Sequence, residues 1–233
     1  MRRFHPSVRF LKRLARARSG VALTEFALSL PLLFAAGLYG VETAYQTAVQ
    51  MQISQLAEQV ADNASRIGDT STLRNRKIYE SDVNDVFAGA NIQADNLDLF
   101  EHGRVILSSL EVVPDTDDQQ YIHWQRCKGT KEVKSSYGME GDGQTGAGLI
   151  GMGPDGEEVM AFKNEAVMFV EIQYDYQPLI GDFIPHRKTM SAIASFNVRD
   201  SRDLTQIYQR DGSTPDTIAD CKVYNGIGSP KPV

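Results

Sequence analysis

The sequence has few of the residues that carry most metal and nucleophile chemistry. Its 233 residues include two cysteines, four histidines and one tryptophan. Cys127 and Cys221 stand alone with no pair of histidines near them, so they lack the spacing of zinc ligands. No serine lies in a Gly-x-Ser-x-Gly turn, and the glycines between Gly138 and Gly156 precede no Gly-Lys-Ser/Thr of a phosphate loop. We therefore expect no enzyme, no metal and no cofactor.

Acidic residues are absent from the first twenty positions. Those positions hold seven basic residues: Arg2, Arg3, Arg9, Lys12, Arg13, Arg16 and Arg18. The rest of the chain holds all 30 acidic residues and only 17 basic ones. Such asymmetry marks a processing or topological boundary. A nucleic-acid-binding tail is the other interpretation, but the apolar segment that follows at once favours a basic leader over residues 1–20.

Long apolar runs are also absent, with one exception. The overall apolar content of 42% is ordinary for a globular chain and excludes a protein of many membrane spans. The exception is Val21–Val41, which contains a single charge, Glu25. About twenty-one residues at ~1.5 Å each cross a hydrocarbon layer of ~30 Å. We predict one transmembrane helix over residues 21–44, with the basic N-terminus in the cytoplasm and the C-terminal part exported.

Glu25 argues against an ordinary secretory signal. Such signals have an apolar region without an embedded acid and are cut after it, yet no small-x-small site lies between Tyr39 and Gln50. An uncleaved anchor remains an alternative. A carboxylate in the membrane needs a partner, because burying it costs about 2.5–3.5 kcal/mol at the centre of the bilayer. A cut after Gly20 would supply one, because Val21 would become a free ammonium on a neighbouring subunit.

The segment from Gly20 through Val-Ala-Leu-Thr to Glu25 and Phe26 resembles the prepilin peptidase signature, with glycine before the cut, glutamate at the fifth mature position and an aromatic at the sixth. The longer string from Arg18 to Phe34 resembles the N-terminus of TadE-like pseudopilins of the tight adherence (Tad) pilus system. Pro31 stands where that family often has a proline, which should kink or loosen the helix.

Weaker similarities follow at Trp124–Cys127, Val170–Leu179 and Val198–Asp203. TadG-like members carry an additional domain for which this chain has no room, so TadE is the favoured subgroup and a TadF-like protein stays open. The resemblance implies leader removal by prepilin peptidase after Gly20, and pairing of Glu25 with the amine of a neighbour's Val21.

The same resemblance implies a setting and partners. The protein would lie in the bacterial inner membrane and act in assembly or initiation of a Tad-type (Flp) pilus for adherence. Its partners would be other Tad pilins and pseudopilins, the inner-membrane assembly platform and the lipid bilayer, with no nucleic acid. A single-pass, membrane-anchored periplasmic binding module is the alternative function.

The helical pattern continues past the apolar run. Apolar residues recur at spacings of three and four and end before Gly68: Tyr45, Val49, Ile53, Leu56, Val60, Ala64 and Ile67. This spacing predicts an amphipathic extension over residues 45–68. Its apolar stripe is expected to pack in the core of the exported domain, and a helix contact between subunits is a second use of the same stripe.

Residues 69–233 are expected to form an exported α+β domain of pilin-like type. Residues 69–77 resemble a linker, and Ser81–Phe87 a short helix ending near Gly89. Alternation predicts a hairpin from Leu97 and Leu99 through a turn at 101–103 to strand 106–112. Further strands are expected at residues 121–124, 170–176 and 190–198, giving an antiparallel sheet after a long helix.

Three features of this domain bear on function. Two cysteines in an oxidising periplasm predict a disulfide between Cys127 and Cys221, with two free thiols as the alternative. The glycine-rich segment 138–156 is interpreted as a flexible loop. The acids at positions 115, 117 and 118 lack the pattern of a calcium loop and suggest a solvated turn, and His102, His123 and His186 show no partner in the sequence.

Overall fold

The computed structural model describes residues 19–69, 75–181 and 184–226. The chain divides into two compact units. The first is Met1–Gln46 with Pro178–His186, and the second is Thr47–Gln177 with Arg187–Val233. Residues 1–18, which are most of the predicted leader, lie outside the described residues.

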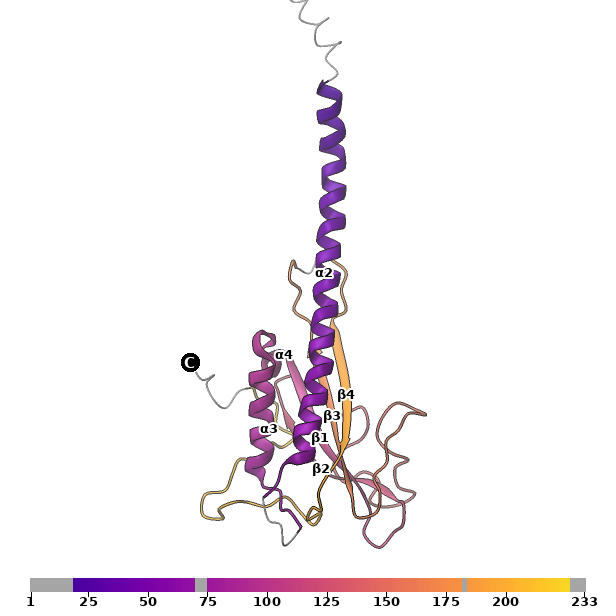
Figure 1. The fold of residues 1–233 in the computed structure, drawn as a ribbon, viewed down its shortest axis with the longest axis vertical. Coiled ribbons are helices and arrows are strands. Elements are labelled where there is room, and N and C mark those ends of the chain that lie inside the picture. Colours follow the sequence, from indigo (N-terminus) through magenta and orange to yellow (C-terminus); the bar gives the residue numbers. More distant parts are fainter. Residues whose placement is uncertain (1–18, 70–74, 182–183, 227–233) are drawn as a thin grey trace, which may run out of the picture. The chain divides into compact units, whose positions relative to one another are not determined.

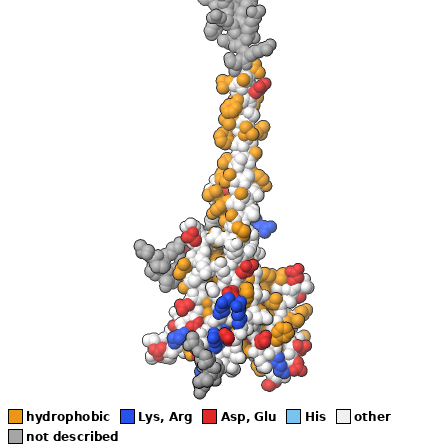
Figure 2. Space-filling model, in the orientation of Figure 1, with side chains coloured by type: hydrophobic (Ala, Val, Ile, Leu, Met, Phe, Trp, Pro, Cys, Tyr) orange, Lys and Arg blue, Asp and Glu red, His pale blue; other side chains and the backbone are white. Residues whose placement is uncertain are grey.

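Helix α2 spans Ser19–Arg66 as one element of 48 residues, close to the predicted bounds (Figure 1). Pro31 lies inside it and does not end it. In the first unit its large apolar side chains are exposed, and Figure 2 shows them spread along the helix. The helix is long and apolar enough to cross a membrane. Its most apolar stretch of 18 residues has a mean hydropathy of 1.8, and none of that stretch is buried. This is the only such helix among the residues searched.

The second unit is an antiparallel sheet with helices on one face. The strands are β1 (Gly103–Val112), β2 (Gln120–Lys128), β3 (Ala166–Asp175) and β4 (Thr189–Asn197), in the order β2-β1-β3-β4. The outer part of α2 and helix α3 (Glu80–Gln93) cover one face (Figure 1). Most of the predicted stripe of α2 packs into this core, because Val49, Ile53, Leu56, Val60 and Ala64 are buried and Ile67 packs against them. Its first member, Tyr45, belongs to the first unit and is 37% exposed. The α+β layout is thus confirmed.

The predicted helix end at Gly89 is wrong. α3 continues to Gln93, because its buried face extends beyond the glycine to Ala90. Gly89 itself has open space where a side chain would be, so the glycine lies on the outer side of the helix and does not terminate it. Packing of a helix face overrides the weak helix propensity of one residue.

The predicted hairpin before β1 is also wrong. Asp95–Leu97 forms a 3-10 turn (η1) and Leu99–His102 a short helix (α4), joined by Asp98 in the left-handed conformation with φ 46°. Leu97 and Leu99 alternate in sequence as in a strand, yet both lie in the core beside the helices. β1 pairs with β2 and β3 instead.

The glycine-rich segment packs against the second face of the sheet. Gly141 N–H donates to Ile122 O at 2.8 Å, and Leu149 N–H donates to Gln120 O at 2.9 Å. Met152 is fully buried in a small cluster with Leu110, Ile122 and Phe169. The segment thus covers part of the sheet with specific contacts, and its flexibility stays a prediction.

Candidate functional site

The four residues predicted for processing and assembly lie on the first two turns of α2. Gly20, Val21, Glu25 and Phe26 are all exposed, with Val21 and Phe26 each more than half accessible. Nothing lies within 4 Å of a side chain built on Gly20. This segment is therefore open on every side within the described part of the chain, which suits an encounter with a peptidase or another helix.

The polar hydroxyls near Glu25 are satisfied inside the helix. Thr24 Oγ1 donates to Val21 O at 2.8 Å, and Ser29 Oγ donates to Phe26 O at 3.1 Å. Glu25 has no hydrogen bond or ion pair within the described residues. In a low-dielectric setting the hydroxyls of Thr24 and Ser29 therefore have hydrogen-bond acceptors, whereas the Glu25 carboxylate has no donor among the described residues. Within residues 19–69, 75–181 and 184–226 nothing therefore neutralises the Glu25 carboxylate.

The bond between Gly20 and Val21 lies in the helical part of α2. A peptidase that acts on extended substrates would have to unwind this first turn. Glycine makes that opening easy, because it is less favourable in a helix than alanine by about 1 kcal/mol. Among the described residues nothing lies within 4 Å of a side-chain carbon placed on Gly20, so no contact there opposes the opening. The low helix propensity of glycine and the exposure of Gly20 and Val21 both leave the bond between them accessible.

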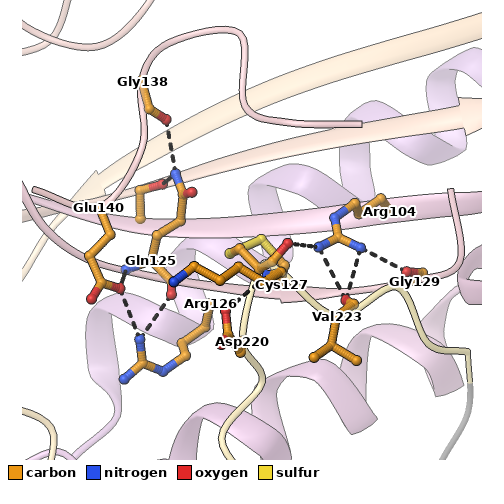
Figure 3. Close-up of a disulfide and its surroundings, with 12 residues drawn as sticks. Arg104, Gln125, Arg126, Cys127, Gly129, Gly138, Glu140, Asp220 and Val223 are labelled. Atoms are coloured by element: carbon orange, nitrogen blue, oxygen red, sulfur yellow. Dashed lines mark hydrogen bonds and ion pairs between the residues drawn. A yellow bond between two sulfur atoms is a disulfide. The ribbon is translucent and has the colours of Figure 1, made fainter. Parts of the chain in front are cut away.

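The structure brings the two cysteines together. Cys127 near the end of β2 is bonded to Cys221 of the C-terminal segment, across 94 positions of sequence (Figure 3). The same segment pairs with the outer edge of β2, because Cys127 N–H donates to Ala219 O at 2.8 Å and Gly129 N–H donates to Asn225 O at 3.1 Å. The predicted disulfide is confirmed, and it attaches the chain end to a sheet edge.

Arg104 holds the same segment from inside, and the sequence pattern gave no sign of it. Its side chain is fully buried on β1, and its guanidinium donates to Cys221 O at 2.7 Å, Gly129 O at 2.9 Å and Val223 O at 3.3 Å (Figure 3). The ring of Tyr224 lies 4.2 Å from the guanidinium carbon. Burial lowers the pKa of Arg104, because removal from solvent disfavours the charged guanidinium. Carbonyl dipoles and an aromatic face therefore replace a carboxylate partner.

Gly129 is needed at this crossing. Its φ is +126°, and an added Cβ would lie 2.2 Å from Gly103 O. Both the backbone conformation and the space exclude other residues. The close approach lets Gly129 O reach Arg104 while its N–H pairs with Asn225.

A groove of about 740 Å³ lies beside the disulfide. Its charged residues are of both signs: Arg126, Lys134, Glu140, Asp220 and Lys222. Arg126 is already engaged, since its Nη2 donates to Glu80 Oε1 at 2.6 Å. Its Nη1 donates to Glu140 Oε2 at 3.2 Å (Figure 3). Burial is the largest single influence on Arg126 and opposes its charge, but the hydrogen bond and charge of Glu80, together with the charges of Glu140 and Asp220, raise its pKa overall. Groups of His, Cys, Asp and Glu that could hold a metal are absent from the residues searched.

A second set of buried polar groups lies on β1 and β2. Glu111 accepts from Ser109 Oγ at 2.6 Å and pairs with His123 Nδ1 at 2.9 Å. The hydrogen bond to Glu111 raises the pKa of His123 above its ordinary 6.5, although burial opposes this. Ser109 and Glu111 are almost wholly buried. His123 thus has a partner that neither its position nor its neighbours in sequence indicated.

The sequence also gave no reason to single out Glu42. It follows the apolar run directly, yet it is only 1% exposed. Its carboxylate accepts from the backbone N–H of Ile180 at 2.9 Å and of Leu179 at 3.3 Å, both in the segment between β3 and β4. An acid directly after an apolar run was the one available signal, but its partners are 137 positions away.

Comparison with protein-family models, curated proteins and solved structures finds no match to this chain. Function must therefore be argued from the residues and contacts described above.

Loss of the disulfide is expected to destabilise the second unit. By the loop-entropy relation, a link closing 94 positions stabilises the folded state by about 4–5 kcal/mol. The double variant Cys127→Ser/Cys221→Ser should unfold at a lower urea concentration, followed by the fluorescence of Trp124 in detergent micelles. Reduced wild-type protein is the matched control and should behave like the variant. An unchanged midpoint in both would contradict a stabilising role.

His123 should make stability depend on pH. Because its folded-state pKa is raised, its contribution is complete below the ordinary pKa of 6.5 and is lost as the pH rises through the folded-state pKa. Wild-type protein should lose more thermal stability than His123→Gln between a pH below 6.5 and a clearly alkaline pH. Equal losses in the two proteins would show that the pair with Glu111 does not couple protonation to folding.

Proposed function

We propose that this protein is a TadE-like minor pseudopilin, processed by prepilin peptidase and acting in assembly or initiation of a Tad-type (Flp) pilus. In this proposal it is anchored in the bacterial inner membrane, with its N-terminus in the cytoplasm and its C-terminal domain in the periplasm. The observation that carries the proposal is Glu25, the only charge in an exposed apolar helix that begins just after a basic leader and Gly20.

The exposure of the helix supports insertion in a bilayer. Residues of the apolar run are exposed on all sides, as Leu23, Phe26, Leu32 and Leu38 illustrate. A soluble protein rarely leaves so large an apolar surface open. The helix is long enough to cross a hydrocarbon layer of about 30 Å.

The state of Glu25 supports assembly in preference to simple anchoring. A plain anchor gains nothing from a carboxylate that has no partner among the described residues. Cleavage after Gly20 would create an ammonium at Val21, and pairing of that ammonium with Glu25 of a neighbour would neutralise both charges. Phe26, exposed next to Glu25, is available to pack against the neighbouring helix.

The disulfide supports placement of the second unit in the periplasm. Disulfides persist in oxidising compartments and are rare in the cytosol. The basic residues before the helix favour the same orientation, because basic flanks stay on the cytoplasmic side.

The groove beside the disulfide favours one alternative, a membrane-anchored periplasmic binding module. That function would survive exchange of residues 21–41 for an unrelated transmembrane helix. A pseudopilin would lose function in the same exchange, because Glu25 and the helix surface act in assembly.

The mature N-terminus tests the proposal directly. In cells with an active prepilin peptidase, mass spectrometry should find a chain that begins at Val21, and Gly20→Val should retain the leader because a β-branched residue replaces the small one at the cut. The same wild-type gene in cells without the peptidase is the control. A chain that keeps residues 1–20 in both strains would exclude pseudopilin processing and favour the anchored module.

The role of Glu25 is tested separately. Glu25→Ala should enter the membrane normally but reduce surface pili strongly, because the amine of the next subunit loses its counter-charge. Glu25→Gln, which keeps the shape and removes the charge, should give the same loss. Thr24→Ala is the matched control, since its hydroxyl is bonded within the helix. Normal piliation in both Glu25 variants would remove the pairing role.

A further inference from the structure

The first unit contains more than the apolar helix. The segment Pro178–His186, between β3 and β4, belongs to the same compact unit as residues up to Gln46 of α2 (Figure 1). Glu42 accepts from the N–H groups of Leu179 and Ile180, which ties the segment to one point on the helix. Ile184 packs with only 7% of its surface exposed. We call Pro178–Gly181 with Ile184–His186 the collar.

The height of the collar along the helix follows from its bond to Glu42. The apolar run Val21–Val41 has a length of about 31 Å at ~1.5 Å per residue, which matches a hydrocarbon core of ~30 Å. Glu42 is the next residue. The collar therefore lies where the hydrocarbon of an inserted helix ends and the headgroups begin.

The side chains at this height fit an interface between apolar and polar surroundings. Leu179 of the collar is 58% exposed although its backbone N–H is bonded to Glu42. Tyr39 and Tyr45, one turn on either side of Glu42, are 54% and 37% exposed. Tyrosines are enriched at the boundary of bilayers, because their rings are apolar and their hydroxyls polar. An exposed leucine at the same level favours contact with the acyl chains just below the headgroups.

The hydrogen bonds of Glu42 hold the collar at this level of the helix. An acid at the end of a membrane helix would ordinarily be drawn into water. Here the carboxylate is 1% exposed and receives two backbone N–H groups, so its polarity is used to hold the segment and is hidden from the lipid.

We propose that the collar is a membrane-contact surface: Glu42 fixes the segment Pro178–Gly181 at the end of the apolar helix, and Leu179 inserts into the interfacial layer of the outer leaflet. The partner is the lipid bilayer itself. The inference rests on the proposed membrane span and adds a second, non-helical contact with the same bilayer. It gives the loop between β3 and β4 a task separate from processing at Gly20 or pairing at Glu25.

The test uses full-length protein reconstituted in lipid nanodiscs and tryptophan quenching by brominated lipids. Wild-type protein, with Trp124 as its one tryptophan and that residue buried, gives the baseline. Leu179→Trp should be quenched most by bromines near the headgroup end of the acyl chains. Leu33→Trp, near the middle of the apolar run, should be quenched most by bromines deep in the chains. Phe162→Trp, at a 70% exposed position of the second unit, gives the quenching of an exposed tryptophan outside the first unit for comparison.

The outcomes separate the two proposals. Quenching at position 33 with none at 179 would overturn the collar and leave the membrane span standing. No quenching at either position would overturn the span, and the collar with it. Adding Glu42→Ala to Leu179→Trp should abolish the quenching at 179 and preserve it in the matched Leu33→Trp/Glu42→Ala protein. Quenching at 179 that survives loss of Glu42 would overturn the fixing role of that carboxylate.

Discussion

The apolar surface of α2 must be removed from water, and this requirement organises the structure. Between Thr47 and Arg66 the apolar residues form a stripe, and the second unit buries that stripe with α3 and the sheet. Between Val21 and Val41 the apolar residues face every direction, and the described residues bury none of the stretch that is apolar enough to cross a membrane. The two parts of α2 therefore differ: one is buried in a protein core, and the other exposes an apolar surface long enough to span a membrane.

Polar side chains on the part of α2 in the first unit meet the same requirement through hydrogen bonds. Thr24 and Ser29 bond to carbonyls of their own helix, which satisfies them without water. Glu42 finds backbone donors in a segment far away in sequence. Glu25 is the exception among these four residues, because the described residues offer its carboxylate no partner. A charge without a partner would be costly in a membrane, so its presence suggests a function. The proposed assembly role follows from this exception.

The second unit secures its chain end in a different way. The sheet has two edges, and the C-terminal segment covers that of β2 through backbone bonds, the disulfide and the buried guanidinium of Arg104. A covalent link limits how far the segment can move, and Arg104 specifies where it rests. Covering an edge also removes a row of backbone groups that could pair with another chain. The groove next to this segment is lined by residues of β2 and of the C-terminal segment, which the disulfide joins.

The sequence by itself determined the elements whose signal is local: the apolar run with Glu25, the stripe of α2, and the strands β2, β3 and β4, since their period is carried by neighbouring residues. The basic leader stays a prediction. It misjudged Leu97 and Leu99, whose alternation resembles a strand, and Gly89, whose effect on the helix is outweighed by packing. The pairing of Cys127 with Cys221 could be expected from their number and from the predicted export of this part of the chain. Only the tertiary structure placed Arg104 beneath the chain end, His123 beside Glu111 and Glu42 against Leu179 and Ile180. Those contacts join residues distant in sequence, and a periodic pattern along the chain contains no information on which distant backbone groups a buried charge will meet.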